Sequence, residues 1–121
     1  MVSKGAFGYM IGRKKRFMCV QNDADLLWQI LVREIYVLMK HYGTKELLQE
    51  AFEKIKVVKN KPKPADIKKY KIFTDLEHDE NNEWRHILRY CQSSFINILE
   101  ATCIPKEEND NRSCFIFLLD F

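Results

Sequence analysis

The chain has 121 residues, of which 46% are hydrophobic and 31% charged, with a formal net charge of +3. This length suits one domain, 1–121, and the composition lies in the globular range, which excludes a disordered chain. So small a net charge does not by itself imply a nucleic-acid partner. No stretch approaches the roughly eighteen apolar residues of a membrane span, and the first residues lack the apolar core of a secretory signal. We therefore expect one intracellular domain, in the cytoplasm or the nucleus.

A β-hairpin over residues 6–21 is the first predicted element. Two runs of β-prone and apolar residues, 7–11 and 17–20, flank a glycine and a basic cluster. The cluster consists of Arg13, Lys14, Lys15 and Arg16. A hairpin turn has to be polar, which explains the four charges, although two arginines also suit phosphate contacts and the composition also suits a nuclear-import signal.

Apolar residues then recur with helical spacing over residues 24–39, and residues 22–23 offer a cap. Ile30 and Val37 fall off the main stripe, so this helix is apolar around most of its circumference. The pattern predicts that the helix lies in the middle of the domain. Gly43 supplies the left-handed residue that ends it.

A second helix is predicted directly after this glycine, with Thr44 as its cap and an apolar stripe over residues 47–55. Prolines among the lysines of residues 59–64 predict an extended surface loop, because proline is excluded from helix interiors. Residues 66–74 fit either a short helix or a strand. The acidic residues of 76–82 predict another loop.

The last predicted helix carries one apolar stripe over residues 84–99, with Asn82 as its cap and Pro105 as its stop. A charged loop follows, and residues 113–119 then predict a closing strand. Apolar side chains alternate on both faces of this strand, so both faces have to be covered.

These elements predict a mainly helical α+β domain, with three to four helices packed on a small antiparallel sheet formed by the N-terminal hairpin and the C-terminal strand. The second apolar face of the closing strand offers a contact surface for another chain. A terminal strand can pair with the edge of a partner or with a second copy of itself. The predicted protein-interface residues are Phe115, Phe117, Leu119 and Phe121.

Charge clustering supports an alternative. Residues 54–71 hold eight lysines and one aspartate, whereas residues 75–83 hold five acids. Lysines in such a segment can neutralise phosphates without reading sequence, and Tyr70 and Phe73 offer rings for stacking on bases. A solvated surface is the ordinary explanation of the same pattern. The candidate phosphate contacts are Arg13, Lys14, Lys15, Arg16, Lys59, Lys61, Lys63, Lys68, Lys69 and Lys71.

The sequence predicts no cofactor and no metal site. Its four cysteines lie in apolar runs and are at least eleven residues apart, whereas structural zinc sites bring their ligands in close pairs. We expect buried thiols at Cys19, Cys91, Cys103 and Cys114.

His86 is the one candidate for a catalytic group, with Glu83 three residues before it and Tyr90 four residues after it. Arg85 and Arg89 share its polar side, and a surface cluster explains the same spacing. We assign no catalytic residue.

The favoured interpretation is a non-catalytic interaction domain, an adaptor or complex subunit, that binds a protein partner or self-associates. Two alternatives stay open. One is a nucleic-acid-binding subunit that contacts phosphates through the basic clusters 13–16 and 54–71. The other is a small enzyme or enzyme-regulating subunit centred on His86.

Overall fold

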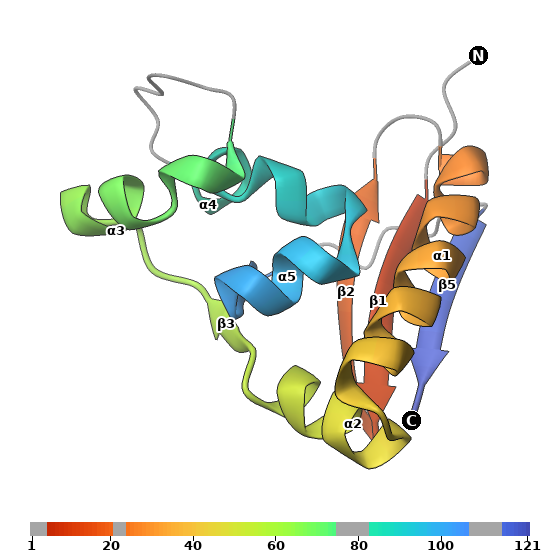
Figure 1. The fold of residues 1–121 in the computed structure, drawn as a ribbon. Helices are drawn as coiled ribbons and strands as arrows, with labels where there is room; N and C mark the ends of the chain where they lie inside the picture. The colour runs from red at the N-terminus through yellow and green to blue at the C-terminus, as the bar shows by residue number, and fades with distance from the viewer. Residues whose placement is uncertain (1–4, 21–23, 75–82, 107–114) are drawn as a thin grey trace.

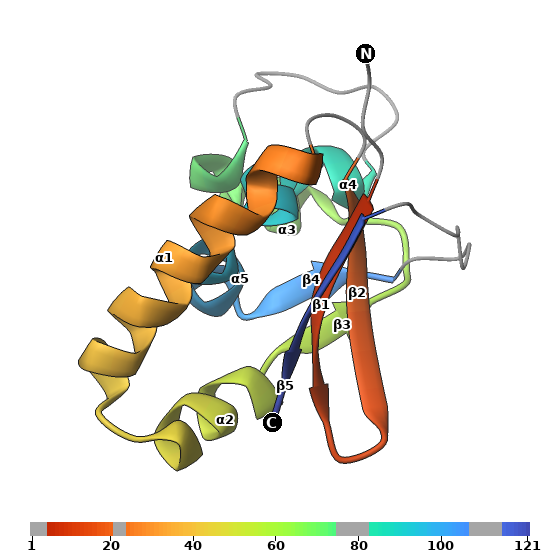
Figure 2. The same ribbon diagram turned by 90° about the vertical axis from the view of Figure 1, so that its right-hand side faces the viewer.

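The computed structural model describes residues 5–20, 24–74, 83–106 and 115–121 (Figure 1). In these residues the chain forms the predicted α+β fold, with helices packed on a small sheet built by the N-terminal hairpin and the C-terminal strand. Figure 2 shows α1, α2 and α5 on the same side of this sheet. The helices and the sheet thus form two layers with a core between them.

The sheet has three strands in the order β2-β1-β5. They are β1 (Gly5–Ile11), β2 (Lys14–Val20) and β5 (Phe115–Asp120). β1 and β2 form the predicted hairpin and pair antiparallel, with Phe7 opposite Met18. β5 lies on the other side of β1 and is one of the two edges of the sheet.

The prediction of a purely antiparallel sheet is wrong, because β5 pairs with β1 in parallel. A tight turn forces two strands to run antiparallel, whereas a connection that contains helices also permits parallel pairing. All the helices of the described residues lie between β1 and β5 in the sequence. A second parallel pair joins β3 (Lys56–Val58) to β4 (Cys103–Pro105), two short strands that the sequence did not predict.

Two glycines of the hairpin have clear structural roles. Gly12 lies in the turn with a φ of 63°, a conformation that favours glycine. At Gly8, a Cβ would collide with the backbone carbonyl oxygen of Arg16. The close approach of β1 and β2 at this point therefore requires a residue without a side chain.

The first two helices end and begin where the sequence predicts. α1 (Ala24–Tyr42) ends at Gly43, which has a φ of 85° and whose N–H donates to the carbonyl oxygen of Met39 at 2.9 Å. Thr44 caps α2 (Lys45–Glu53), because its hydroxyl accepts a hydrogen bond from the N–H of Leu47 at 3.2 Å. The cap predicted at residues 22–23 lies outside the described residues.

The segment after α2 combines the predicted loop with a short helix. Residues 59–63 connect β3 to α3 (Pro64–Lys69), and a 3-10 turn, η1 (Lys71–Phe73), follows. Pro64 occupies the first helical position, where the absence of an N–H costs nothing. Of the two structures that fit residues 66–74, the helix is the one that forms. The acidic loop predicted over residues 76–82 lies outside the described residues.

The single helix predicted over residues 84–99 is wrong. The segment divides into α4 (Trp84–Ile87), the 3-10 helix η2 (Arg89–Ser93) and α5 (Phe95–Ala101). The break between η2 and α5 falls at Ser94, whose backbone is extended, with a φ of −157°. The apolar stripe continues through this break, so periodicity alone did not indicate it.

A carboxylate from α1 explains why α5 starts at this position. Glu34 accepts a hydrogen bond from the N–H of Phe95 at 2.8 Å and another from the hydroxyl of Ser94. The Ser94 hydroxyl in turn accepts from the N–H of Asn97 at 3.1 Å. These partners satisfy N–H groups in the first turn of α5, and the negative charge suits that end of a helix.

The core lies between the sheet and the helices. Three phenylalanines from different elements meet there: the ring centroid of Phe95 lies 5.2 Å from that of Phe7 and 5.6 Å from that of Phe52. Both pairs have the edge-to-face geometry that aromatic rings prefer. In the described residues, no helix combines the length and apolar character needed to cross a membrane.

Candidate interaction surface

The inner side of α1 packs against the domain. Leu27, Leu31 and Leu38 are buried, with Leu31 fully inaccessible to solvent. Their spacing places them on one side of a helix that turns by about 100° per residue. α1 contacts both β1 and β5, so this side lies over the parallel half of the sheet (Figure 1).

The outer side of α1 is also apolar but is exposed. α1 thus lies at the surface, and the prediction that it lies in the middle of the domain is wrong. The domain covers one side of the helix and leaves the rest to solvent. Seven of its large apolar residues are exposed: Leu26, Trp28, Ile30, Val32, Tyr36, Val37 and Met39.

These residues form two groups on either side of a polar ridge made by Gln29, Arg33 and Lys40. One group, which we call the outer stripe, consists of Trp28, Val32, Tyr36 and Met39. The other, which we call the opposite flank, consists of Leu26, Ile30 and Val37. Trp28 and Tyr36 are 51% and 71% exposed, large values for aromatic residues in a helix that packs on a sheet.

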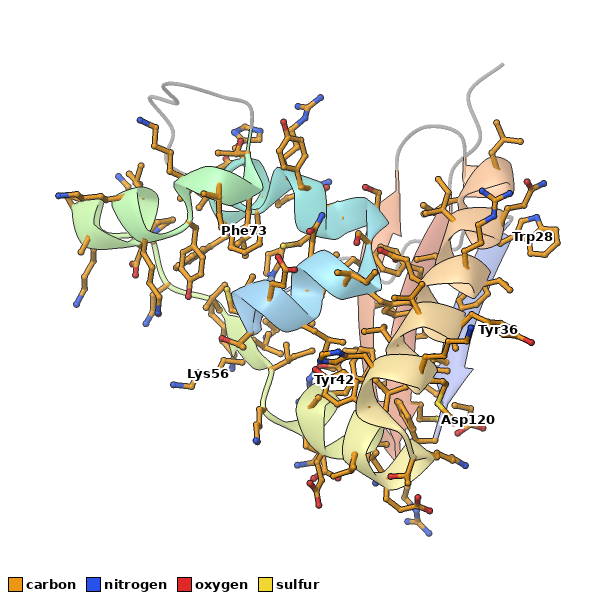
Figure 3. All side chains as sticks on the ribbon, in the orientation of Figure 1. Trp28, Tyr36, Tyr42, Lys56, Phe73 and Asp120 are labelled. Atoms are coloured by element: carbon orange, nitrogen blue, oxygen red, sulfur yellow. The ribbon has the colours of Figure 1, made fainter. Side chains whose placement is uncertain are left out.

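The outer stripe lies beside β5. Figure 3 shows Trp28 and Tyr36 pointing away from the helical layer, on the side where β5 and Asp120 lie. The opposite flank is on the side of α1 that carries Glu34, whose carboxylate bonds to the start of α5. The outer stripe and the opposite flank therefore have different neighbours, and of the two only the outer stripe borders an edge of the sheet.

The edge of β5 offers backbone hydrogen-bonding groups beside the outer stripe. No described strand pairs with β5 on the side away from β1. The N–H of Phe121 donates to the carbonyl oxygen of Met10 at 3.0 Å. Backbone groups of successive strand residues point to opposite sides, so residues 116, 118 and 120 direct their N–H and C=O groups to the outer edge.

The side chains predicted for a protein interface turn toward the helices instead. The ring of Phe117 lies 6.1 Å from that of Phe95, and the ring of Phe121 lies 5.4 Å from that of Phe52. Leu119 also packs against the core. The side chain of Phe115 lies outside the described ones. What β5 directs outward in the plane of the sheet is its backbone edge.

The outer stripe is a sizeable apolar surface. The exposed fractions of its four residues add up to about two. At about 200 Å² for each fully exposed large side chain, this corresponds to about 400 Å² of exposed surface. Contiguous apolar patches of about 300–600 Å² are the largest on typical monomers and are often functional.

The hairpin cluster lies far from the lysines of α3 (Figure 1 and Figure 2). Arg13 lies in the hairpin turn, and Lys14, Lys15 and Arg16 begin β2. The other candidate contacts lie in the loop before α3, in α3 and in η1. In both Figure 1 and Figure 2 the hairpin turn is at the bottom of the molecule and α3 is in its upper half, so the hairpin cluster and the lysines of α3 lie at different ends.

The aromatic residues among the lysines are part of the core. Tyr70 and Phe73 are buried, and the Tyr70 ring lies 5.8 Å from that of Trp84 and 6.2 Å from that of Phe73. Burial raises the pKa of Tyr70 to about 12. The six candidate lysines of this region are exposed, with the Lys69 ammonium 5.2 Å from the Tyr70 ring centre. Exposed lysines remain, but the proposed stacking rings are not available at the surface.

The remaining candidate groups are His86 and the buried cysteines. His86 is half-buried on α4, and Tyr90 is exposed in η2. Cys91 and Cys103 are buried free thiols, as predicted, and burial raises the pKa of Cys91 to about 12. A thiol with such a pKa stays protonated at neutral pH. Among the described residues no three His, Cys, Asp or Glu side chains gather as metal ligands do.

The outer stripe was present in the sequence but was not recognised as a surface. The helical spacing over residues 24–39 does not by itself separate Trp28, Val32 and Met39 from the buried leucines. The polar ridge offered a signal, because Gln29, Arg33 and Lys40 lie on one side of a helical wheel and mark its solvent direction.

Comparisons of the chain with protein-family models, with curated proteins and with solved structures gave no match.

Proposed function

We propose that this chain is a non-catalytic interaction domain, an adaptor or complex subunit, and that it binds another protein chain along the outer stripe and the edge of β5. The observation that carries the proposal is the concentration of exposed apolar side chains on α1 beside an edge strand with outward backbone groups. The stripe would bury apolar side chains of the partner, and the edge would pair with an extended segment.

Physical chemistry favours a protein over a nucleic acid as the partner on this surface. Burial of apolar area contributes about 25 cal/mol per Å², so an outer stripe of about 400 Å² offers about 10 kcal/mol before the costs of association. A nucleic-acid surface would instead need cations, and β5 and the outer stripe include none. Exposed tryptophan and tyrosine are also the residues that most often dominate protein interfaces.

Site-specific photo-crosslinking tests this proposal. p-Benzoylphenylalanine is placed at position 36, in the outer stripe, or at position 37, in the opposite flank. The two positions are adjacent in sequence and both exposed, at 71% and 56%, but they differ by about 100° around the helix. Each protein is irradiated both in purified form and in an extract of cells that naturally contain this protein. Mass spectrometry then identifies the crosslinked chains.

We expect a protein crosslink at position 36 that is absent at position 37. A crosslinked protein counts as a partner only if it also binds the purified chain, and if Tyr36→Glu abolishes that binding while Val37→Glu preserves it. Equal crosslinking at both positions, or no protein crosslink at position 36, would overturn the proposal.

The nucleic-acid alternative predicts a different result. Fluorescence anisotropy with a labelled single strand and a labelled duplex, at low and at physiological salt, measures phosphate binding directly. Salt-dependent binding that is lost when Lys61, Lys63, Lys68 and Lys69 are neutralised, together with no crosslink at position 36, would favour that alternative over an interaction with protein.

A further inference from the structure

We infer that the chain that occupies this surface is a second copy of the same protein, paired through β5 in an antiparallel register centred on Leu118. This inference rests on the proposed function and adds the identity and register of the partner. The dimer would have a continuous six-stranded sheet, with the two α1 helices on the same side of it, and a two-fold axis perpendicular to the sheet at Leu118.

The backbone of β5 is complementary to itself under this symmetry. The N–H of Phe121 bonds to Met10 of β1, and successive residues of a strand direct their backbone groups to opposite sides. Residues 116, 118 and 120 therefore direct their N–H and C=O groups outward. Centring the pairing on Leu118 sets residue 118 against its own copy and residue 116 against residue 120 of the second copy. Each outward group of the strand then meets an outward group of the same strand in the other chain, so none is left unpaired.

The two edges of the sheet differ in their protection against pairing. β2, at one edge, begins with Lys14, Lys15 and Arg16, and basic residues on an edge strand oppose pairing with another strand. β5, at the other edge, has no basic residue and no proline, and its one charged residue is Asp120. In the proposed register the two Asp120 residues lie four positions apart along the strands, or about 14 Å, so their charges do not meet.

The outer stripe supplies about half of the area that a stable dimer needs. A standard interface buries about 800 Å² on each partner. About half of this is the roughly 400 Å² of exposed side chains in the outer stripe, and the remainder falls to the β5 edge and its half-buried side chains. Because α1 lies over β1 and β5, the same two-fold axis turns the outer stripe of each copy toward that of the other.

Cysteine crosslinking tests the register. Leu118→Cys places two thiols opposite each other in a hydrogen-bonded pair, where the Cα atoms are about 5.5 Å apart, within the range of a disulfide. Asp120→Cys is the matched control, because it lies on the same face of β5 two residues away but about 14 Å from its own copy. The wild-type protein reports any dimer formed through its native cysteines. Light scattering measures the mass of all three without oxidant.

We expect a mass near twice 14.5 kDa for all three proteins, and rapid formation of a disulfide dimer under mild oxidation by Leu118→Cys only. Tyr36→Glu should give monomers, and Val37→Glu should leave the mass doubled. A monomeric wild-type protein at high concentration, or equal crosslinking of the two cysteine variants, would overturn the inference. If the protein is monomeric and position 36 crosslinks to a different protein, the inference fails while the proposed function stands.

Discussion

The two sides of α1 are built from the same kinds of residue but have opposite surroundings. Leu31 on the inner side is fully buried, whereas Tyr36 on the outer side is 71% exposed. The inner side meets a sheet and a neighbouring helix of the same chain, whereas the residues of the outer stripe are exposed. The apolar content of a helix therefore does not reveal which part stabilises the fold and which part remains for another molecule.

Replacement of one residue from each side should give the largest contrast. Leu31→Ala leaves a cavity in the core and should lower the free energy of unfolding by about 2–5 kcal/mol. Trp28→Ala removes a larger side chain, yet it should lower the stability of the monomer by only about 1 kcal/mol, because half of that side chain is already exposed.

Urea denaturation measures both variants. The protein concentration has to be low enough to keep the chains monomeric, since self-association would add apparent stability that Trp28→Ala removes. Equal destabilisation by the two substitutions would mean that the outer stripe belongs to the fold, and the proposed interface would lose its support.

A smaller effect is expected at the boundary between the two sides, where Glu34 holds the start of α5. Glu34→Ala removes the acceptor for the N–H of Phe95 and for the hydroxyl of Ser94, and should cost about 1–3 kcal/mol of stability. Glu50→Ala, an exposed site on α2, is the control and should have little effect. Thermal unfolding compares the variants, and similar melting temperatures for both would contradict the role assigned to Glu34.

Glu34 also shows why some elements of this fold were predictable from local sequence and others were not. The hairpin, the end of α1 and the cap of α2 depend on neighbouring residues such as Gly12, Gly43 and Thr44, so local patterns were sufficient. The break before α5 depends on a carboxylate sixty residues earlier in the chain. The parallel pairing of β5 is equally non-local, because no turn chemistry constrains strands that are separated by most of the sequence.

The candidate surface was predictable only in part. The apolar excess of the first helix is visible in the sequence at Ile30 and Val37. The two apolar faces of the closing strand likewise indicate a contact surface for a partner. Which side of the helix stays exposed depends on where the sheet lies, and this cannot be inferred from helical spacing alone. For the same reason, rings at Tyr70 and Phe73 that looked available for nucleic acid are core residues.

The layer beneath the inner side of α1 makes a further contribution that depends on pH. Tyr9 of β1 is buried, its ring lies 4.8 Å from that of Phe52, and burial raises its pKa from 10.0 to about 12, although Arg16 lowers it slightly. The folded protein therefore keeps the phenol proton in a range of pH in which the unfolded chain loses it. The stability that Tyr9 provides is complete below pH 10 and is lost as the pH rises toward 12.

A comparison of the wild-type protein with Tyr9→Phe isolates this contribution. Between pH 8 and pH 11 the wild type should lose about 1.4 kcal/mol more stability than the variant, the equivalent of one pKa unit. Tyr70 and Cys91 also titrate late, but they are present in both proteins and cancel in the difference. If the two proteins lose stability in parallel, water reaches Tyr9 and the core between the sheet and the helices is not sealed. The contrast between the two sides of the helix would then be one of degree only.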